Sequence, residues 1–163
     1  MPTMTKSTRT TRNQRYNPAS DEYHKEDFPF YWLAMVNGRY SRAMEKTLKK
    51  VNLDVPRWRI LIILKDEGPS SISAIATHAI AKLPTVTKTI YRMKADGLVD
   101  TAVRSDDGRV TDVTITEAGL ETIHNIHDTT EELFRQSFKG LTPVQLTRLN
   151  KLLETIYHNL PEH

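Results

Sequence analysis

The chain of 163 residues contains no cysteine, which excludes disulfides, thiolate nucleophiles and cysteine-ligated zinc. It has no run of about 18 apolar residues, the length that a membrane-spanning helix requires. Glycine is scarce, with six residues, and none of them forms a nucleotide-binding fingerprint. A nucleophile-and-base motif is also missing. These absences argue against an enzyme and a membrane protein, and we expect neither a metal ion nor a cofactor.

Hydrophobic residues make up 38% of the chain and charged residues 26%, which is typical of one globular domain with an ordinary core. The formal net charge of +3 suits a nucleic-acid-binding protein without demonstrating one. The N-terminal stretch lacks the apolar segment of a secretory signal, so we expect a cytoplasmic protein.

Residues 1–27 are polar and are predicted to form a mobile N-terminal arm. Its basic residues come first and its acidic residues follow: Lys6, Arg9, Arg12, Arg15, then Asp21, Glu22, Glu26, Asp27. A basic arm can lie along DNA, and a plain disordered tail is the alternative.

Helical periodicity begins near Pro29, where apolar residues recur at three-, four- and seven-residue steps. A second helix is predicted after Asp54, ending at Gly68 and Pro69. A third, short helix should open at Ser70 and Ser71. A fourth should cover residues 84–96, because Gly97 is typical of a left-handed helix end.

After Gly97 the apolar period changes to two, which predicts strands. The runs LVDTAVR and VTDVTIT are joined by SDDG, and an Asp-Gly pair between such runs favours a two-stranded hairpin. Thr116 can then cap a fifth helix. A capping box beginning at Thr142 opens a sixth helix over 142–160, with leucine and isoleucine spaced by threes and fours.

A short helix, a turn and a second helix form a helix-turn-helix unit, and the hairpin that follows makes it a winged one. The second helix of such a unit enters the major groove of DNA. Within 84–99, Val86, Ile90 and Met93 fall on one side of the helix and are predicted to be buried. The other side carries Thr85, Thr87, Lys88, Arg92 and, at its edge, Tyr91.

The hairpin tip RSDDGRV presents Arg104 and Arg109, a suitable pair for an arm that enters a minor groove. A solvated helix face is the alternative reading, because residues 84–109 hold five basic and four acidic residues.

The chain resembles the MarR family of winged-helix transcriptional regulators over about residues 30–160. The wing is the most specific part: Asp107-Gly108-Arg109 followed by Val113, Ile115, Thr116 and Gly119 is similar to the family's D-x-R and V-x-L-T-x-x-G. A second match runs from Ile75-Ala76 through Thr85-Val86-Thr87-Lys88 to Met93 and Gly97-Leu98. The resemblance implies an α+β, mainly helical fold, with a winged helix-turn-helix between N- and C-terminal dimerisation helices.

The resemblance also implies roles for individual residues. Arg109 would enter the minor groove and Asp107 would orient it by a charge-assisted hydrogen bond. Where the family often has glycine in the turn and serine at the cap, this chain has Ile80 and Lys82, so Lys82 would place a cation near a DNA phosphate. The full set of expected DNA contacts is Lys82, Thr85, Thr87, Lys88, Tyr91, Arg92, Arg104, Asp107 and Arg109.

The expected domain division follows. Residues 28–163 form the MarR-like domain, in which 52–116 bind DNA and the flanking segments, 28–51 and 117–160, form the dimer.

A ligand pocket is implied between the first two helices, the DNA-binding part and the fifth helix. Trp32, Tyr40 and Trp58 are its expected aromatic residues, and Arg39 would pair with an aromatic carboxylate. A role in core or dimer packing is the alternative for these aromatics. The stretch 53–59 also looks like family members that sense aromatic acids or their coenzyme A thioesters. His124 and His127, with Glu121 and Asp128 near, make zinc a weaker alternative.

These observations predict a homodimeric transcriptional repressor in a bacterial or archaeal cytoplasm. It would bind a pseudo-palindromic operator in double-stranded DNA and be released by a small aromatic acid or aromatic acyl-coenzyme A. The alternatives are a metal-sensing regulator of the same fold and a winged-helix module that binds protein.

Overall fold

The computed structural model describes residues 14–161. The first half of the predicted arm, with Lys6, Arg9 and Arg12, lies outside the described residues. The chain divides into two compact units, of which the first ends at Lys46 and the second begins at Thr47. Among the described residues, no helix combines the length and the hydropathy that a membrane span needs.

The first unit contains two short 3-10 helices and most of one long helix: η1 Gln14–Tyr16, η2 Lys25–Asp27 and α1 Pro29–Leu48. Aromatic rings pack around the start of α1, where the ring centroids of Phe28 and Phe30 are 5.4 Å apart. Arg15 pairs with Asp27 at 2.6 Å, so the described end of the arm folds back on itself.

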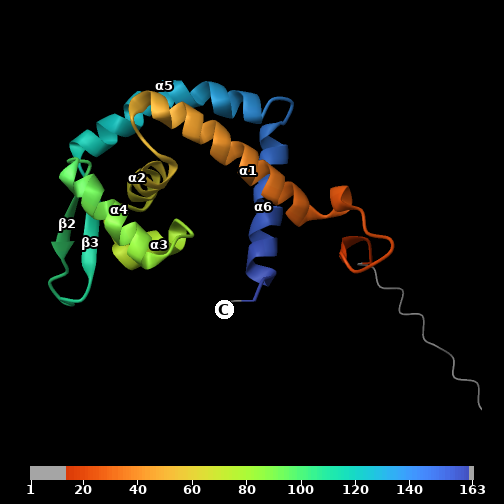
Figure 1. The fold of residues 1–163 in the computed structure, drawn as a ribbon, viewed down its shortest axis with the longest axis horizontal. Helices are drawn as coiled ribbons and strands as arrows, with labels where there is room; N and C mark the ends of the chain where they lie inside the picture. Colours follow the sequence, from red (N-terminus) through yellow and green to blue (C-terminus); the bar gives the residue numbers. More distant parts are fainter. Residues whose placement is uncertain (1–13, 162–163) are drawn as a thin grey trace, which may run out of the picture. The chain divides into compact units, whose positions relative to one another are not determined.

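The second unit has the predicted order of elements (Figure 1). Its elements are η3 Lys49–Val51, α2 Val55–Glu67, β1 Ser70–Ser71, α3 Ile72–His78, α4 Leu83–Ala95, β2 Val99–Val103, β3 Thr111–Ile115, α5 Glu117–Ser137 and α6 Pro143–Asn159.

The predicted helix boundaries rest on capping, and the structure confirms them. Asp54 accepts a hydrogen bond from the backbone N–H of Arg57, and Thr116 accepts one from Gly119. Thr142 forms the full capping box with Gln145. Gly97 follows the C-cap of α4, and its positive φ of 75° is the left-handed conformation that ends a helix. Each cap satisfies backbone groups that a helix end leaves unpaired.

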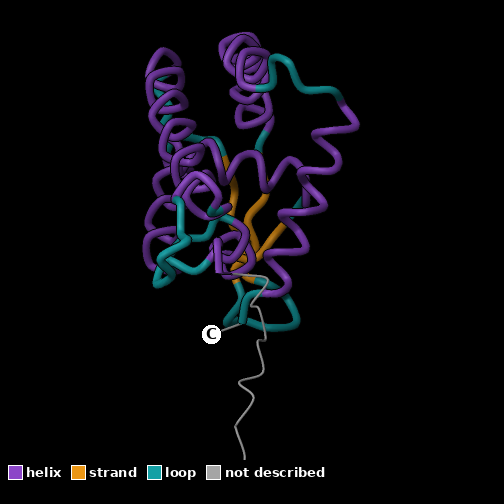
Figure 2. Tube along the Cα trace, turned by 90° about the vertical axis from the view of Figure 1, so that its right-hand side faces the viewer, coloured by secondary structure: helices purple, strands orange, loops and turns teal. Residues whose placement is uncertain are grey.

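The sheet differs from the predicted two-stranded hairpin, because β1 adds a third strand (Figure 2). The order is β1-β3-β2, with all pairs antiparallel. Ser70 and Ser71 pair with Val113 and Asp112 before Ser71 caps α3. From sequence, both serines are predicted to open a helix, because a strand of two polar residues has no alternating apolar pattern to detect.

The core of the second unit lies between α2, α3, α4 and the sheet. Its fully buried side chains include Leu61, Ile75, Ile90, Met93 and Val113. Burying side chains of this size stabilises the unit by about 1.5–3 kcal/mol each. The winged part is therefore a rigid platform for its exposed face.

Candidate nucleic-acid interface

Helix α4 separates its apolar and polar sides as predicted. Val86, Ile90 and Met93 are at most 3% exposed, and they fix which side of the helix faces outward. That outer side carries the exposed residues Lys88 and Arg92. The remaining predicted contacts on and near this helix are also exposed, apart from half-buried Thr87: Lys82, Thr85, Tyr91.

Thr87 is less free than the sequence indicated. Its hydroxyl donates to the carbonyl of Leu83 at 2.8 Å, and Thr89 does the same to Thr85 at 2.9 Å. A hydroxyl that donates within its own helix can still accept a hydrogen bond. The Thr87 hydroxyl can therefore still accept a hydrogen bond from DNA, whereas the Thr85 hydroxyl can both donate and accept one.

The turn before α4 closes without glycine, as its sequence requires. Ile80 takes the left-handed conformation, with φ at 52°, and its side chain is 91% exposed. A β-branched residue is strained in this conformation. Arg59 holds the turn from α2, because its guanidinium donates to the carbonyl of Ala79 at 3.0 Å.

The two arginines of the wing have different surroundings. Arg104 forms two hydrogen bonds with Asp112, of 2.9 and 2.6 Å. This hydrogen bonding lowers the pKa of the Asp112 carboxyl. The guanidinium of Arg104 is thus engaged within the wing and braces its two strands.

Arg109 projects from the wing, with its side chain 92% exposed. Asp107 accepts from the backbone N–H and from the Nε of Arg109, both at 3.1 Å. These bonds lower the pKa of the Asp107 carboxyl. One edge of the Arg109 guanidinium is held, while its terminal nitrogens stay available for a DNA acceptor.

Helix α4 and the wing meet at a hollow of about 220 Å³. Thr87 and Arg109 line it together with Ser71 and Ser73. In a winged helix, the DNA strand between the major and minor grooves passes between these two elements. The lining of the hollow is mixed, because the apolar residues Ile72, Leu83 and Val110 accompany these polar side chains.

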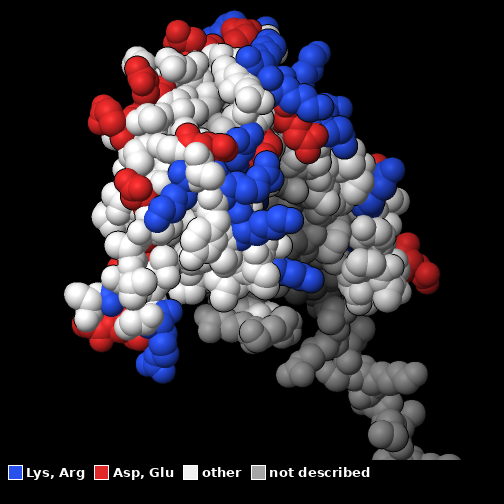
Figure 3. All heavy atoms as spheres, turned by 60° about the vertical axis from the view of Figure 1, so that its left-hand side comes forward, with Lys and Arg blue, Asp and Glu red and all other residues white. Residues whose placement is uncertain are grey.

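Charges on this side of the molecule are of both signs. Figure 3 shows basic and acidic side chains interspersed on the visible face. Binding by this face would depend on individual contacts rather than on one large positive field.

A second, apolar cavity of about 520 Å³ lies in the same unit between α2 and α5. Its lining includes Trp58, Ile62, Phe134 and Phe138, with Lys65, His127 and Arg135 as its basic residues and Glu131 as its acidic one. The sequence prediction missed Lys65, Phe134 and Phe138 as lining residues. They come from segments about 70 residues apart, and no local pattern connects them.

Trp58 belongs to this lining, but the other three predicted ligand residues lie on α1 in the first unit. Trp32 is half exposed and its indole N–H donates to the carbonyl of Glu26 at 2.8 Å. Arg39 is exposed and Tyr40 is half-buried. Their role in a pocket stays a prediction.

The histidines of α5 are grouped differently from the expected zinc set. His127, Asp128 and Glu131 bring ligand atoms within 4.8 Å of one another, and all three are exposed. His124 and Glu121 do not belong to this group. Exposed groups of this kind are common on helices that bind no metal.

A winged helix-turn-helix with long flanking helices, an exposed recognition helix and a wing arginine defines a class of DNA-binding regulator. The chain belongs to the MarR family, whose sequence model matches residues 53–111. Regulators of this family bind operator DNA as dimers. The resemblance seen in the sequence and the predicted fold class are confirmed.

Two relatives and one solved structure are similar to the chain. It is 62% identical over 148 residues to the HTH-type transcriptional repressor IacR of Pseudomonas putida, covering 91% of this chain and 89% of the relative. It is 29% identical over 107 residues to the homoprotocatechuate degradative operon repressor of Escherichia coli, covering 66% of this chain and 72% of the relative. A MarR family regulator from Silicibacter pomeroyi has the same fold, with a TM-score of 0.78 at 23% identity, over 86% of this chain and 94% of that one.

Proposed function

We propose that the protein is a dimeric repressor that leaves its operator when a small aromatic acid, or the coenzyme A thioester of one, binds. The apolar cavity between α2 and α5 is the observation that carries the proposal. Both relatives are repressors by name, and one is the repressor of an operon for degrading an aromatic acid. A repressor of chromosomal genes would act in the cytoplasm, at the nucleoid.

The cavity has the chemistry of an aromatic-acid site. Trp58, Phe134 and Phe138 offer ring faces, and a volume of about 520 Å³ accepts one or two fused rings. Lys65 and Arg135 stand at the same cavity and carry the charge that a carboxylate needs. The Nε of Arg135 already donates to Glu132 at 2.9 Å, so Lys65 is the more available cation.

On the DNA side, Lys88 and Arg92 of α4 would contact the major groove, and Arg109 of the wing would contact the minor groove. Two copies of this unit would read two half-sites, which requires a dimer and a pseudo-palindromic operator. We assign the dimer contacts to α1, α5 and α6.

The cavity is connected to α4 through α5. Thr116, at the start of α5, donates its hydroxyl to the carbonyl of Gly97 at 2.6 Å. One turn later, a Cβ on Gly119 would collide with the carbonyl of Leu98, so α5 runs directly against the segment that follows α4. A ligand that changes the spacing of α2 and α5 would therefore bias the position of α4, by its different affinity for the two arrangements.

Tryptophan fluorescence tests the cavity, because the chain has only Trp32 and Trp58. The Trp32→Phe variant reports from Trp58 alone, and Trp58→Phe reports from Trp32 alone. We expect a panel of one- and two-ring aromatic acids and their thioesters to contain a compound that quenches the Trp32→Phe variant. The same compound should weaken operator binding in a gel shift.

Lys65→Met should weaken that compound's effect while leaving operator binding intact, and Arg39→Ala is the matched test of the other candidate cation. Quenching of Trp32 alone would move the site to α1. If no compound in the panel changes the fluorescence or the gel shift, the aromatic effector is wrong.

A further inference from the structure

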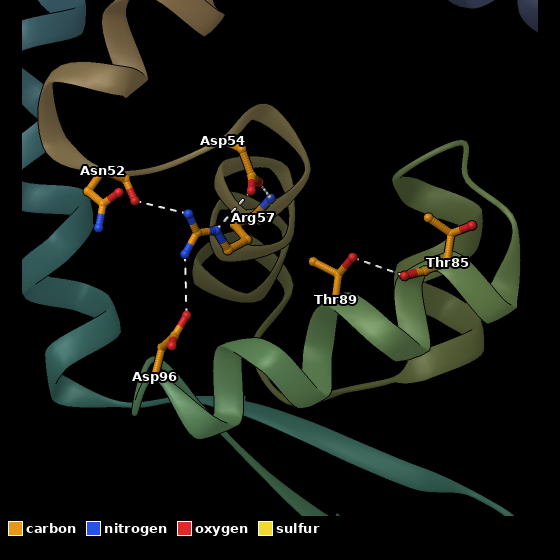
Figure 4. A network of polar contacts seen from close by, with 6 residues as sticks. All are labelled: Asn52, Asp54, Arg57, Thr85, Thr89 and Asp96. Atoms are coloured by element: carbon orange, nitrogen blue, oxygen red, sulfur yellow. Dashed lines mark hydrogen bonds and ion pairs between the residues drawn. The ribbon is translucent and has the colours of Figure 1, made fainter.

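Arg57, in the first turn of α2, is a charged residue that the surface hardly exposes. Its side chain is 15% exposed, and its guanidinium is surrounded by oxygen atoms from three residues (Figure 4). Nε donates to Asp54 at 3.1 Å, Nη2 to the carbonyl of Asn52 at 2.9 Å, and Nη1 to Asp96 at 3.3 Å. A largely buried cation with a partner for each nitrogen is a built contact, because burying it unpaired would be strongly unfavourable.

The three partners belong to two parts of the fold. Asn52 and Asp54 form the connection between η3 and α2, and Asp96 is the C-terminal cap of α4. Arg57 therefore joins the recognition helix to α2 and to the segment that precedes it. Asp96 is 39 residues away in the chain, so this is a tertiary contact rather than a local cap.

The two ends of α4 are held differently. At its start, Lys82 provides no side-chain hydrogen bond to the helix. At its end, Asp96 is bound by Arg57, Gly97 is bound by Thr116, and Lys94 donates to the Thr101 hydroxyl at 2.7 Å. The C-terminal end thus has three side-chain contacts, whereas the start of α4 has one polar contact from α2, the donation by Arg59 to the Ala79 carbonyl in the preceding turn.

Arg57 adds a directional contact to the apolar packing that holds α4. Contacts such as those of Val86 and Met93 are non-directional, whereas a guanidinium is planar and its donors have set directions. All three guanidinium nitrogens of Arg57 already donate to oxygen atoms of the protein.

We propose that Arg57 is a positioning residue for operator recognition: it sets the angle of α4 by tying the Asp96 cap to α2. This inference rests on the proposed DNA-binding function. The neighbouring Trp58 lines the cavity, so the contact of Arg57 with Asp96 also links the cavity to α4 through α2. An occupied cavity could then act on α4 from both α2 and α5.

Asp96→Asn is the decisive variant, because the Asp96 side chain is 52% exposed and its ion pair adds little to stability. The variant should keep the parent's melting temperature. Affinity for a duplex of scrambled sequence should stay equal or rise, because one negative charge has been removed. Affinity for the operator should fall about 3- to 30-fold, the range of coupling through such contacts.

Asp100→Asn is the matched control. It removes the same charge from an exposed residue on the adjacent strand β2 and should leave the ratio of operator to scrambled affinity unchanged. Arg57→Gln should lower that ratio as Asp96→Asn does, and the double variant should be no worse than Arg57→Gln alone.

An Asp96→Asn protein with the parent's ratio would overturn the inference, and so would a fall of the same size in Asp100→Asn. Should Arg57→Gln fail to fold, Asp96→Asn still decides the matter. A parent protein that does not distinguish the operator from the scrambled duplex would instead contradict the proposed function.

Discussion

Helices α4 and α6 have similar sequence patterns, but their apolar sides lie in different surroundings. Both have a proline in their first turn, and both carry apolar residues at helical spacing. Helix α4 buries Val86, Ile90 and Met93 within the chain, whereas α6 buries none of its residues. Leu149 and Leu152 remain 45% and 54% exposed. The spacing of apolar residues therefore predicts which side of a helix is apolar. It does not predict whether that side packs within the same chain or against a second one.

This difference divides the molecule into a part that is complete in one chain and a part that is not. The winged part has its core, its caps and its ion pairs within one chain. Helix α6 leaves an apolar stripe that a second copy would cover, at about 25 cal/mol per Å² of apolar surface removed from water. The variants below separate the two parts, beginning with the largest expected effect.

Leu149→Asp should abolish the dimer and with it operator binding. Burying an unpaired carboxylate costs several kcal/mol, and a two-fold axis places one from each protomer at the interface. Sedimentation of the variant should show a monomer at micromolar concentration, with the helical circular dichroism of the parent retained.

Asn150→Asp adds the same charge to the next residue of α6 and is the control, since it should remain dimeric. A dimeric Leu149→Asp protein would show that α6 does not form the interface.

The wing gives the next largest effect. Arg109→Ala should weaken operator binding by about 2–6 kcal/mol, because a contact of about 1–3 kcal/mol is lost twice in a dimer. Sequence preference in the major groove should be largely preserved, because Arg109 acts in the minor groove.

Arg104→Ala is the matched wing variant. Its guanidinium is engaged by Asp112, so Arg104→Ala should cost clearly less affinity than Arg109→Ala when both variants are titrated against labelled operator DNA by fluorescence anisotropy. Equal losses would mean that the variants act by loosening the hairpin rather than by removing a DNA contact.

Lys88→Ala should change which operator variants are tolerated, with a loss of about 1–3 kcal/mol at one base pair in each half-site. Thr85→Val should act at a neighbouring position and more mildly, since it keeps the methyl group and loses the hydroxyl. Competition against single-base operator variants at two salt concentrations measures both. A uniform loss over all variants, with a lower salt slope, would make Lys88 a phosphate contact instead.

The smallest effect concerns pH. Hydrogen bonds from Arg109 lower the pKa of Asp107 in the folded protein, so the wing pair contributes above the ordinary aspartate pKa and is lost as pH falls through the lowered value. The ratio of operator affinities of the parent and Asp107→Asn should therefore be constant from about pH 6 to pH 8. A ratio that drifts within this range would show that another titrating group controls the wing.

The sequence predicted the parts that local chemistry decides. Asp54, Thr116 and Thr142 are caps because their side chains reach backbone groups three residues away. The third strand was missed, because Ser70 and Ser71 become a strand only through β3, more than 40 residues away. The DNA-facing residues of α4 were found because helical spacing alone sorts them.

The sites that depend on distant segments were harder to predict. Lys65 and Phe134 share a cavity only once α2 and α5 have packed together. Arg57 and Asp96 also come together only in the folded chain. The sole local indication of an ion pair was Asp54, three positions before Arg57. The engagement of Arg104 by Asp112 was also invisible, because it depends on the register of β2 and β3.

The central claim is that the exposed face of α4 and the wing reads a specific DNA sequence. The direct measurement is the affinity of the parent protein, at several salt concentrations, for a genomic fragment recovered by sequencing DNA that the protein retains, and for a scrambled duplex of equal length. We expect a preference of about 10³ or more for the recovered fragment and a logarithmic salt slope that is steeply negative for both duplexes. Equal affinity for the two duplexes, or no binding to either, would contradict the account.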